Sequence, residues 1–261
     1  MKKAILLVAL CFVLECSFTI SQSVDTSTDS ANRNRAGVAL LNRGDYNGAA
    51  ALFEEAVKMR PDHAVAYYNL GTALFHLGQH EKARQTLLKA TKIDPGFSKA
   101  FNQLGVVQTE LQDYRSARDS FAKVMALDPA DSSGPSNYGS MLVRMGKIAK
   151  SIEWLERANR QDPANLEVKF NLAYAYGRKR RFREAVAVAC SALKLDPADE
   201  DIRLMLVTFE VASGNKQAAL DEYQAVHLAN PSLGRRIFDA IHGKWVINVP
   251  PMRRTATGLA P

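Results

Sequence analysis

The chain has 261 residues, of which 47% are hydrophobic and 23% are charged, with 15 glycines and 10 prolines. This length and balance fit one or two domains with a sizeable core, and they exclude a collagen-like or wholly disordered chain. The formal net charge of +7 permits an acidic partner or surface without naming one. The three cysteines, Cys11, Cys16 and Cys190, are too few for a disulfide framework.

The first 21 residues have the pattern of a targeting segment. Lys2 and Lys3 form a short positive region, and eleven apolar residues follow at 4–14. In a helix these eleven residues span about 16 Å, roughly half of a bilayer core, so a stable membrane span is not expected. The pattern is typical of a secretory signal peptide. We expect an exported chain, periplasmic or secreted, with residues 1–21 as the signal.

The end of this segment leaves alternatives open. Cleavage after Ser21 or Ser23 satisfies the small-residue requirement of signal peptidases. A lipid anchor on Cys16 is a second possibility, but Glu15 stands where lipoprotein signals place a small residue. An uncleaved segment would anchor the protein in the membrane. Residues 22–29, which are rich in serine, threonine and aspartate, are expected to form a flexible leader.

The body of the chain repeats every 34 residues. Six prolines follow one another at this constant step: Pro61, Pro95, Pro129, Pro163, Pro197 and Pro231. Self-similarity at such a period is typical of a solenoid, in which each unit stacks on its neighbours because it cannot bury its apolar face alone.

Alignment on the prolines shows further periodic positions. A small residue usually lies 24 places before each proline (Gly37, Gly71, Gly105, Gly139, Ala173 and Val207), and mostly large ones lie eight places before it (Phe53, Leu87, Phe121, Leu155, Ala189 and Tyr223). Mostly small residues flank the latter positions at helical spacing, 12 and five places before the proline. These positions predict two closely packed helices in each unit.

The two helices of each unit are separated by a turn. Glycine, which tolerates positive φ, is the commonest residue 17 places before the proline (Gly44, Gly78, Gln112, Gly146, Arg180 and Gly214). The second helix should end before the proline, because a residue that precedes proline is pushed out of the helical region. Each unit is therefore predicted to be a helical hairpin.

These positions resemble the tetratricopeptide repeat family, and the second unit matches its pattern best. That unit supplies Tyr67, Leu70, Gly71, Leu74, Ala83, Leu87, Ala90 and Pro95. The resemblance implies an all-α, right-handed α-solenoid of six hairpins over 30–233 (30–63, 64–97, 98–131, 132–165, 166–199 and 200–233), a capping helix at 234–243 and an extended or disordered tail at 244–261. Gly134 and Pro135 should shorten or fray one helix, and Glu210 replaces an apolar residue.

The family resemblance also implies a non-catalytic scaffold that holds a peptide segment or helix of a partner protein in a concave groove. The residues expected to line that groove are Tyr68, Asn69, Asn102, Gln103, Asn137, Phe170, Asn171 and Tyr174. Amide side chains bond a peptide backbone without reading its sequence, and aromatic rings supply anchor area. The alternative for Asn69, Asn137 and Asn171 is that each simply bonds the adjacent helix.

A rival function rests on charge. Five cations crowd into six residues at the turn of the fifth unit: Arg178, Lys179, Arg180, Arg181 and Arg183. With the basic carboxyl end, they could bind an anionic surface such as lipid headgroups, an acidic polymer or an acidic protein. The alternative is a solvated loop with Phe182 packed in the core. An exported protein meets little nucleic acid, so none is expected as a partner.

Catalytic patterns are absent from the sequence. His76 and His80 flank a predicted turn and need not share a helical face as zinc ligands would. Cys190 lies beside a packing position and is expected to be a small buried hydrophobe. We therefore expect no enzyme activity, metal, cofactor or small-molecule substrate.

Overall fold

The computed structural model describes residues 28–243, which form helices and short connections with no strand in that range. The predicted fold class, an all-α array of helical hairpins, is confirmed. The first helices of the hairpins are residues 28–42, α3 (Ala64–His76), α5 (Ser98–Glu110), α7 (Ser133–Arg144), α9 (Leu166–Arg178) and α11 (Glu200–Ala212). The second helices are α2 (Tyr46–Met59), α4 (His80–Ile93), α6 (Tyr114–Leu127), α8 (Ile148–Gln161), α10 (Phe182–Leu193) and α12 (Lys216–Val226), and α13 (Pro231–His242) closes the array.

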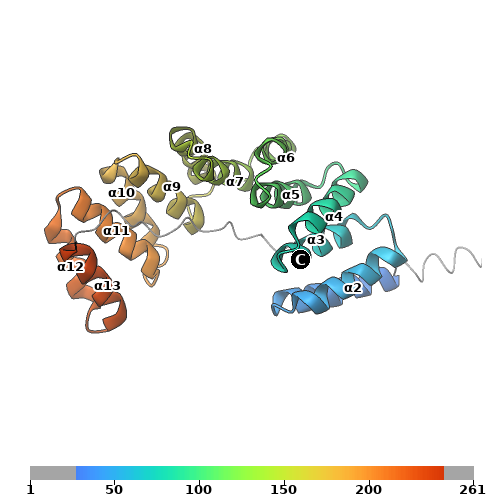
Figure 1. Cartoon of the computed structure of the whole chain (residues 1–261), viewed down its shortest axis with the longest axis horizontal. Helices are drawn as coiled ribbons and strands as arrows, with labels where there is room; N and C mark the ends of the chain where they lie inside the picture. The colour runs from blue at the N-terminus through green and yellow to red at the C-terminus, as the bar shows by residue number, and fades with distance from the viewer. Residues whose placement is uncertain (1–27, 244–261) are drawn as a thin grey trace, which may run out of the picture. The chain divides into compact units, whose positions relative to one another are not determined.

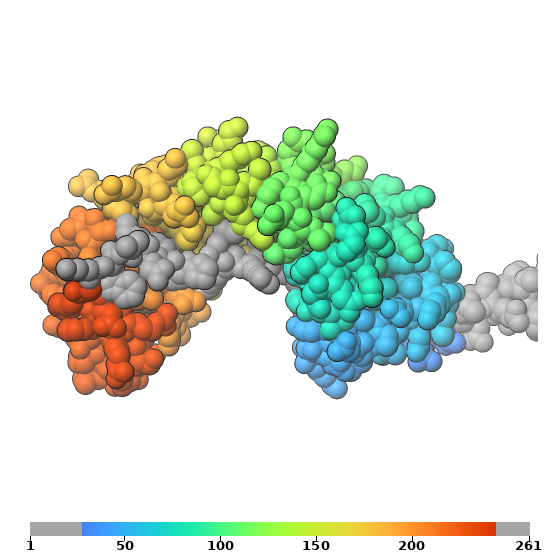
Figure 2. Space-filling model, viewed as in Figure 1, coloured from blue at the N-terminus to red at the C-terminus, as the bar shows by residue number. Residues whose placement is uncertain are grey.

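The described chain divides into two compact units, residues 28–113 and residues 114–243. Unit 1 contains the helices up to α5, and unit 2 contains α6 to α13. Within each unit a helix packs on the helices next to it in the sequence, and neighbouring first helices also touch (Figure 1). Because each helix packs on its neighbours in the sequence, the colours on the surface of each unit change in the order of the chain (Figure 2). Both units therefore have the nearest-neighbour packing of a repeat protein.

The turns inside the hairpins have the predicted conformation. Gly44, Gly78, Gly146 and Gly214 have φ between 73° and 88°. Gln112 and Arg180 occupy the same position with φ of 60° and 59°, which is unusual for residues that carry a side chain. A main-chain hydrogen bond closes each turn, as where Arg181 N donates to Tyr176 O at 3.0 Å. The turn is thus built in the same way with or without glycine.

The loops between hairpins are held by aspartates that precede proline. Asp94, Asp128, Asp162 and Asp196 each accept, through Oδ1, the main-chain N–H two residues further on, at 2.9 to 3.1 Å. This contact is an Asx turn, which gives a loop amide a partner and turns the chain into the next hairpin. In the first hairpin the corresponding residue is Arg60, whose Nε donates to Asp62 Oδ1 at 3.1 Å instead.

Close approach of the two helices within a hairpin explains the small residue 24 places before the proline. A Cβ added at Gly37, Gly71 or Gly139 would lie 2.6 to 2.8 Å from Phe53, Leu87 or Leu155 of the same hairpin. In the fifth hairpin both positions are alanine, Ala173 and Ala189, and both are buried in one cluster. In this hairpin alanine replaces the usual glycine on the first helix, and a second alanine replaces the usual large residue on the second helix.

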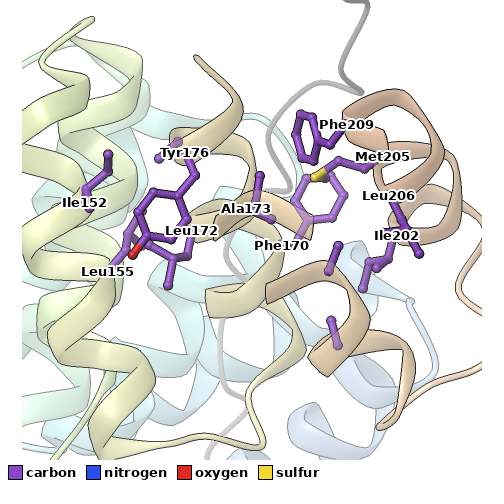
Figure 3. Packing of buried hydrophobic residues seen from close by; sticks show 14 of the residues in the cluster. Ile152, Leu155, Phe170, Leu172, Ala173, Tyr176, Ile202, Met205, Leu206 and Phe209 are labelled. Carbon is purple, nitrogen blue, oxygen red and sulfur yellow. The ribbon is translucent and has the colours of Figure 1, made fainter. Parts of the chain in front are cut away.

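Each unit has its own buried core. The core of unit 1 runs from Leu41 through Phe53 and Leu87 to Val107. In unit 2 the larger cluster includes Leu155, Phe170, Leu172, Met205 and Phe209, contributed by α8, α9 and α11 (Figure 3). A second cluster joins α11, α12 and α13 through Val207, Ala219 and Ile237. The capping helix is therefore packed onto the last hairpin.

Two boundaries differ from the sequence-based prediction. Residues 28 and 29, assigned to a flexible leader, are already helical, and the nearby Ser30 hydroxyl donates to Ala56 O at 2.9 Å. The capping helix begins at Pro231 rather than at residue 234, because Asn230 caps it by accepting from Leu233 N at 3.0 Å. The expected shortening of the helix that contains Gly134 and Pro135 is confirmed, since α7 begins one residue later than the equivalent helices α3 and α5. Both residues are buried within α7. The predicted signal segment, residues 1–21, and the tail, 244–261, lie outside the described residues.

Candidate functional site

Four of the predicted groove residues lie in unit 1, on the neighbouring first helices α3 and α5. Tyr68 and Asn69 are buried on α3, and the Tyr68 ring packs against Phe97 with centroids 5.1 Å apart. On α5, Gln103 is buried, whereas Asn102 is half-exposed. The structure therefore brings these four residues to adjacent helices but leaves them with different access to solvent.

The amides of unit 1 differ in their hydrogen bonding. Asn69 Nδ2 donates to Asn34 Oδ1 at 3.0 Å. This side chain therefore bonds the adjacent first helix, which is the alternative that the sequence left open for Asn69. Gln103 Nε2 is buried and has no hydrogen-bond partner. A buried donor without an acceptor costs free energy, so Gln103 retains hydrogen-bonding capacity that the fold does not use.

The other four predicted residues lie in unit 2, and two of them are amides. Asn137 on α7 and Asn171 on α9 are both buried. Asn171 Nδ2 donates to Ser140 Oγ at 3.1 Å, which links α9 to α7, while Asn171 Oδ1 has no partner. Asn171 thus serves the contact between neighbouring first helices, as Asn69 does, and its own Oδ1 atom remains unsatisfied.

The two aromatic residues of α9 have different surroundings. Phe170 is 1% exposed and belongs to the core of unit 2, where it lies near Met205 (Figure 3). Tyr174, one turn further along, is half-exposed, and its hydroxyl accepts from Arg178 Nη1 at 2.9 Å. Of these two rings, Tyr174 is the one with both solvent access and a polar handle, the combination typical of an interface residue.

All five cations of the predicted basic patch are exposed at the turn between α9 and α10. Arg181 pairs with Glu184 at 2.9 Å, and its guanidinium lies 4.5 Å from the centroid of the Tyr176 ring. Phe182 packs inward against Phe209, with ring centroids 6.3 Å apart. The turn therefore presents charge to solvent, while its aromatic residue is partly buried against the core of unit 2.

Two buried ionisable residues were not among the predicted site residues. Lys169 on α9 is 5% exposed; its Nζ donates to Ser191 Oγ at 2.9 Å and Asn159 Oδ1 at 3.2 Å, and burial lowers its pKa. Glu210 on α11 is 6% exposed, and burial, together with Glu222 and Asp221, raises its pKa to about 7. Glu210 was detectable in the sequence as a departure from an apolar position, whereas nothing in the sequence indicated that Lys169 is buried.

The histidine and cysteine side chains take structural positions. His76 stacks on Tyr46 with centroids 4.5 Å apart, and burial lowers its pKa. Cys190 is half-buried against the core of unit 2, and burial raises the pKa of its thiol. Across residues 28–243 no three metal-ligating side chains gather into one group, and no helix there combines the length and apolarity needed to cross a bilayer.

Stacked helical hairpins with a constant 34-residue step define a class of protein, the helical repeat proteins. Family models described as tetratricopeptide repeat match residues 34–96, 98–131, 136–165 and 170–232, which together make up more than half of the chain. The chain belongs to the tetratricopeptide repeat family. The repeat boundaries agree with the hairpins seen in both units.

Solved structures with the same fold include PilF from Pseudomonas aeruginosa, with a TM-score of 0.69 at 19% identity over 83% of this chain and 99% of that chain. PilW, described as a type IV pilus biogenesis factor, has a TM-score of 0.71 at 19% identity over 80% of this chain and 98% of that one. YrrB, described as having an unusual peptide-binding site, has a TM-score of 0.55 at 20% identity over 72% and 97%. Comparison with curated protein sequences found no match. At these identities the likeness shows the fold alone.

Proposed function

We propose that this protein is a non-catalytic scaffold that holds an extended segment or a helix of a partner protein against its first helices. The fold indicates a protein–protein interaction role, because tetratricopeptide repeat proteins are typically scaffolds rather than enzymes. YrrB, a protein of similar fold, is described as binding a peptide.

The observation that carries the proposal is the surface of α9. Tyr174 is half-exposed, and its hydroxyl is held by Arg178 at 2.9 Å, so the ring is already ordered before a partner arrives. A pre-ordered aromatic side chain loses little rotamer freedom on binding and supplies a large contact area. Tyr174 is therefore the proposed anchor of the partner segment in unit 2.

Unsatisfied amide atoms support main-chain recognition. Asn171 Oδ1, on the same helix as Tyr174, and Gln103 Nε2 in unit 1 lack partners. After a small movement of the side chain, Asn171 Oδ1 could accept a hydrogen bond from a main-chain N–H. Gln103 Nε2 could in the same way donate to a main-chain carbonyl. An extended segment carries both groups at every residue other than proline, which fits this mode of binding.

The proposed compartment is the periplasm or the exterior. The support is the sequence of residues 1–21, with its lysines and eleven apolar residues. A fusion of the full chain to a reporter that is active only after export tests this. Activity that disappears when residues 4–14 are made polar supports export, and activity that persists contradicts it.

Site-specific crosslinking tests the scaffold proposal. A photoreactive amino acid at position 174 should crosslink to a partner in cells, whereas the same amino acid at Ala187, exposed on the second helix α10, should not. Tyr174→Ala should then weaken binding of the purified partner by about tenfold or more, as expected for an aromatic hot spot. Equal crosslinking from positions 174 and 187, or an unchanged affinity for the Tyr174→Ala variant, would contradict the proposal.

A further inference from the structure

The hairpin turns of unit 2 carry a large excess of positive charge. Three equivalent segments, 144–151, 178–185 and 212–219, form these turns and the helix ends beside them. Their nine cations are Arg144, Lys147, Lys150, Arg178, Lys179, Arg180, Arg181, Arg183 and Lys216, against one carboxylate, Glu184. All nine cations are exposed. We call these three segments the basic turn edge.

The three segments lie on one edge of unit 2. Helix α9 packs beside both α7 and α11, and the three run in the same direction because an antiparallel second helix separates each from the next. The opposite edge consists of the loops 128–133, 162–167 and 196–201, which contain eight carboxylates and no lysine or arginine. The two edges are one helix apart, about 20 Å.

The acidic edge has a structural explanation. Asp128, Asp162 and Asp196 accept loop amides, and Asp199 caps α11 by accepting from Ile202 N at 2.9 Å. These carboxylates are required to build the loops and to begin the helices.

The basic edge has no equivalent explanation. Three of its cations lie at the C-termini of α7 and α9, where the helix dipole favours them: Arg144, Arg178 and Lys179. Five lie in the first turns or at the N-caps of α8, α10 and α12, where the dipole disfavours them: Lys147, Lys150, Arg181, Arg183 and Lys216. The corresponding segments of the first three hairpins, 42–49, 76–83 and 110–117, make the same turn with three cations and four carboxylates. The excess charge is therefore a property of hairpins four to six and not a requirement of the fold.

We propose that the basic turn edge docks unit 2 onto an anionic phospholipid surface. Ile148 is buried and Phe182 packs against Phe209, so the edge offers charge without an exposed apolar anchor at these positions. Protein interfaces are generally centred on buried aromatic or aliphatic anchors. A layer of phosphate headgroups instead attracts lysine and arginine by charge alone, each contributing roughly fivefold in affinity. This proposal does not depend on partner binding by the first helices.

Vesicle co-sedimentation with the full chain tests the proposal. The protein should bind vesicles of phosphatidylglycerol and phosphatidylcholine in equal parts, and rising salt should release it. Vesicles of phosphatidylcholine alone measure any binding by the apolar segment 4–14. The triple variant K179Q/R180G/R183Q should bind the anionic vesicles roughly 100-fold more weakly. The glycine suits this turn, because glycine already occupies the equivalent position in four of the hairpins.

A matched variant separates the edge from net charge. R43Q/K82Q/R115Q removes the same charge from exposed cations of the first three hairpins and should leave vesicle binding unchanged. Circular dichroism confirms that both variants remain helical. Equal loss in both variants, binding that persists at high salt, or equal binding to neutral vesicles would overturn the proposal. It would also fail if the edge bound polyglutamate or duplex DNA but not the anionic vesicles.

Discussion

Leu87 packs directly on the main chain of Gly71, and a Cβ at residue 71 would lie 2.6 Å from Leu87 Cγ. The two residues belong to facing helices, α3 and α4, and Leu87 is fully buried. The contact sets how closely the helices of the second hairpin approach.

Gly71→Ala should therefore lower the free energy of unfolding by about 1–3 kcal/mol, the usual cost of overpacking a core. Urea denaturation followed by circular dichroism measures the change. The double variant G71A/L87A should lose less than the sum of the two single variants, since the smaller residue at 87 makes room for the new methyl group. Strict additivity would contradict a direct contact.

Arg180 has φ of 59° at a turn position where most of the hairpins have glycine. Arg180→Gly should raise the free energy of unfolding by roughly 0.5–1 kcal/mol. This net gain is the backbone strain that glycine relieves in the folded state, minus the cost of its greater conformational freedom in the unfolded chain. Gln112→Gly, at φ of 60°, is a control that changes no charge and should act in the same direction. Thermal unfolding checks both variants, and a stabilised Arg180→Gly beside an unaffected Gln112→Gly would point to charge instead of backbone strain.

The raised pKa of Glu210, about 7, makes the stability of unit 2 depend on pH. Because the folded-state pKa lies above 4.5, the ordinary value of a glutamate carboxyl, the stability that the protonated Glu210 contributes is fully present below pH 4.5 and is lost as pH rises through 7. Glu210→Leu places an apolar residue where three of the equivalent positions have leucine, namely Leu40, Leu74 and Leu142. It should be more stable than the natural protein by roughly 1–3 kcal/mol at pH 8, with the advantage shrinking towards pH 5. Denaturant titrations at these pH values measure the difference, and a constant difference would contradict titration of this group.

Phe170 and Tyr174 should respond differently to truncation. Phe170→Ala empties a fully buried site and should cost about 3–5 kcal/mol in the free energy of unfolding. Tyr174→Ala removes a half-exposed ring and should cost clearly less, about 1 kcal/mol. Chemical denaturation compares the two variants. If Tyr174→Ala were as destabilising as Phe170→Ala, a loss of binding in that variant would no longer identify a contact with the partner.

The periodic features of the fold were predictable from sequence, because they depend on local stereochemistry. Proline ends a helix, glycine permits positive φ, and a small residue permits close packing wherever the 34-residue register places them. Gln112 and Arg180 occupy the turn position that is glycine in the other four hairpins. The sequence still predicted both turns correctly, because the 34-residue register continues through these two residues.

The surface of the first helices was less predictable. Phe170 and Tyr174 are four residues apart, and helical spacing assigns both to the same face. Their different burial depends on what the neighbouring helices contribute, such as Met205 from α11, and the spacing within one helix does not contain that information. The amide contacts show the same limit, since Asn171 bonds Ser140 of the preceding hairpin.

The second helices begin at residues 46, 80, 114, 148, 182 and 216, without a single insertion. A gain or loss of 34 residues therefore returns the chain to the same point of the hairpin, with proline, turn and helix starts still in phase. Such a change would lengthen or shorten the array by a whole module while keeping the kind of junction on either side. The architecture is thus open to growth by duplication of coding sequence, one hairpin at a time.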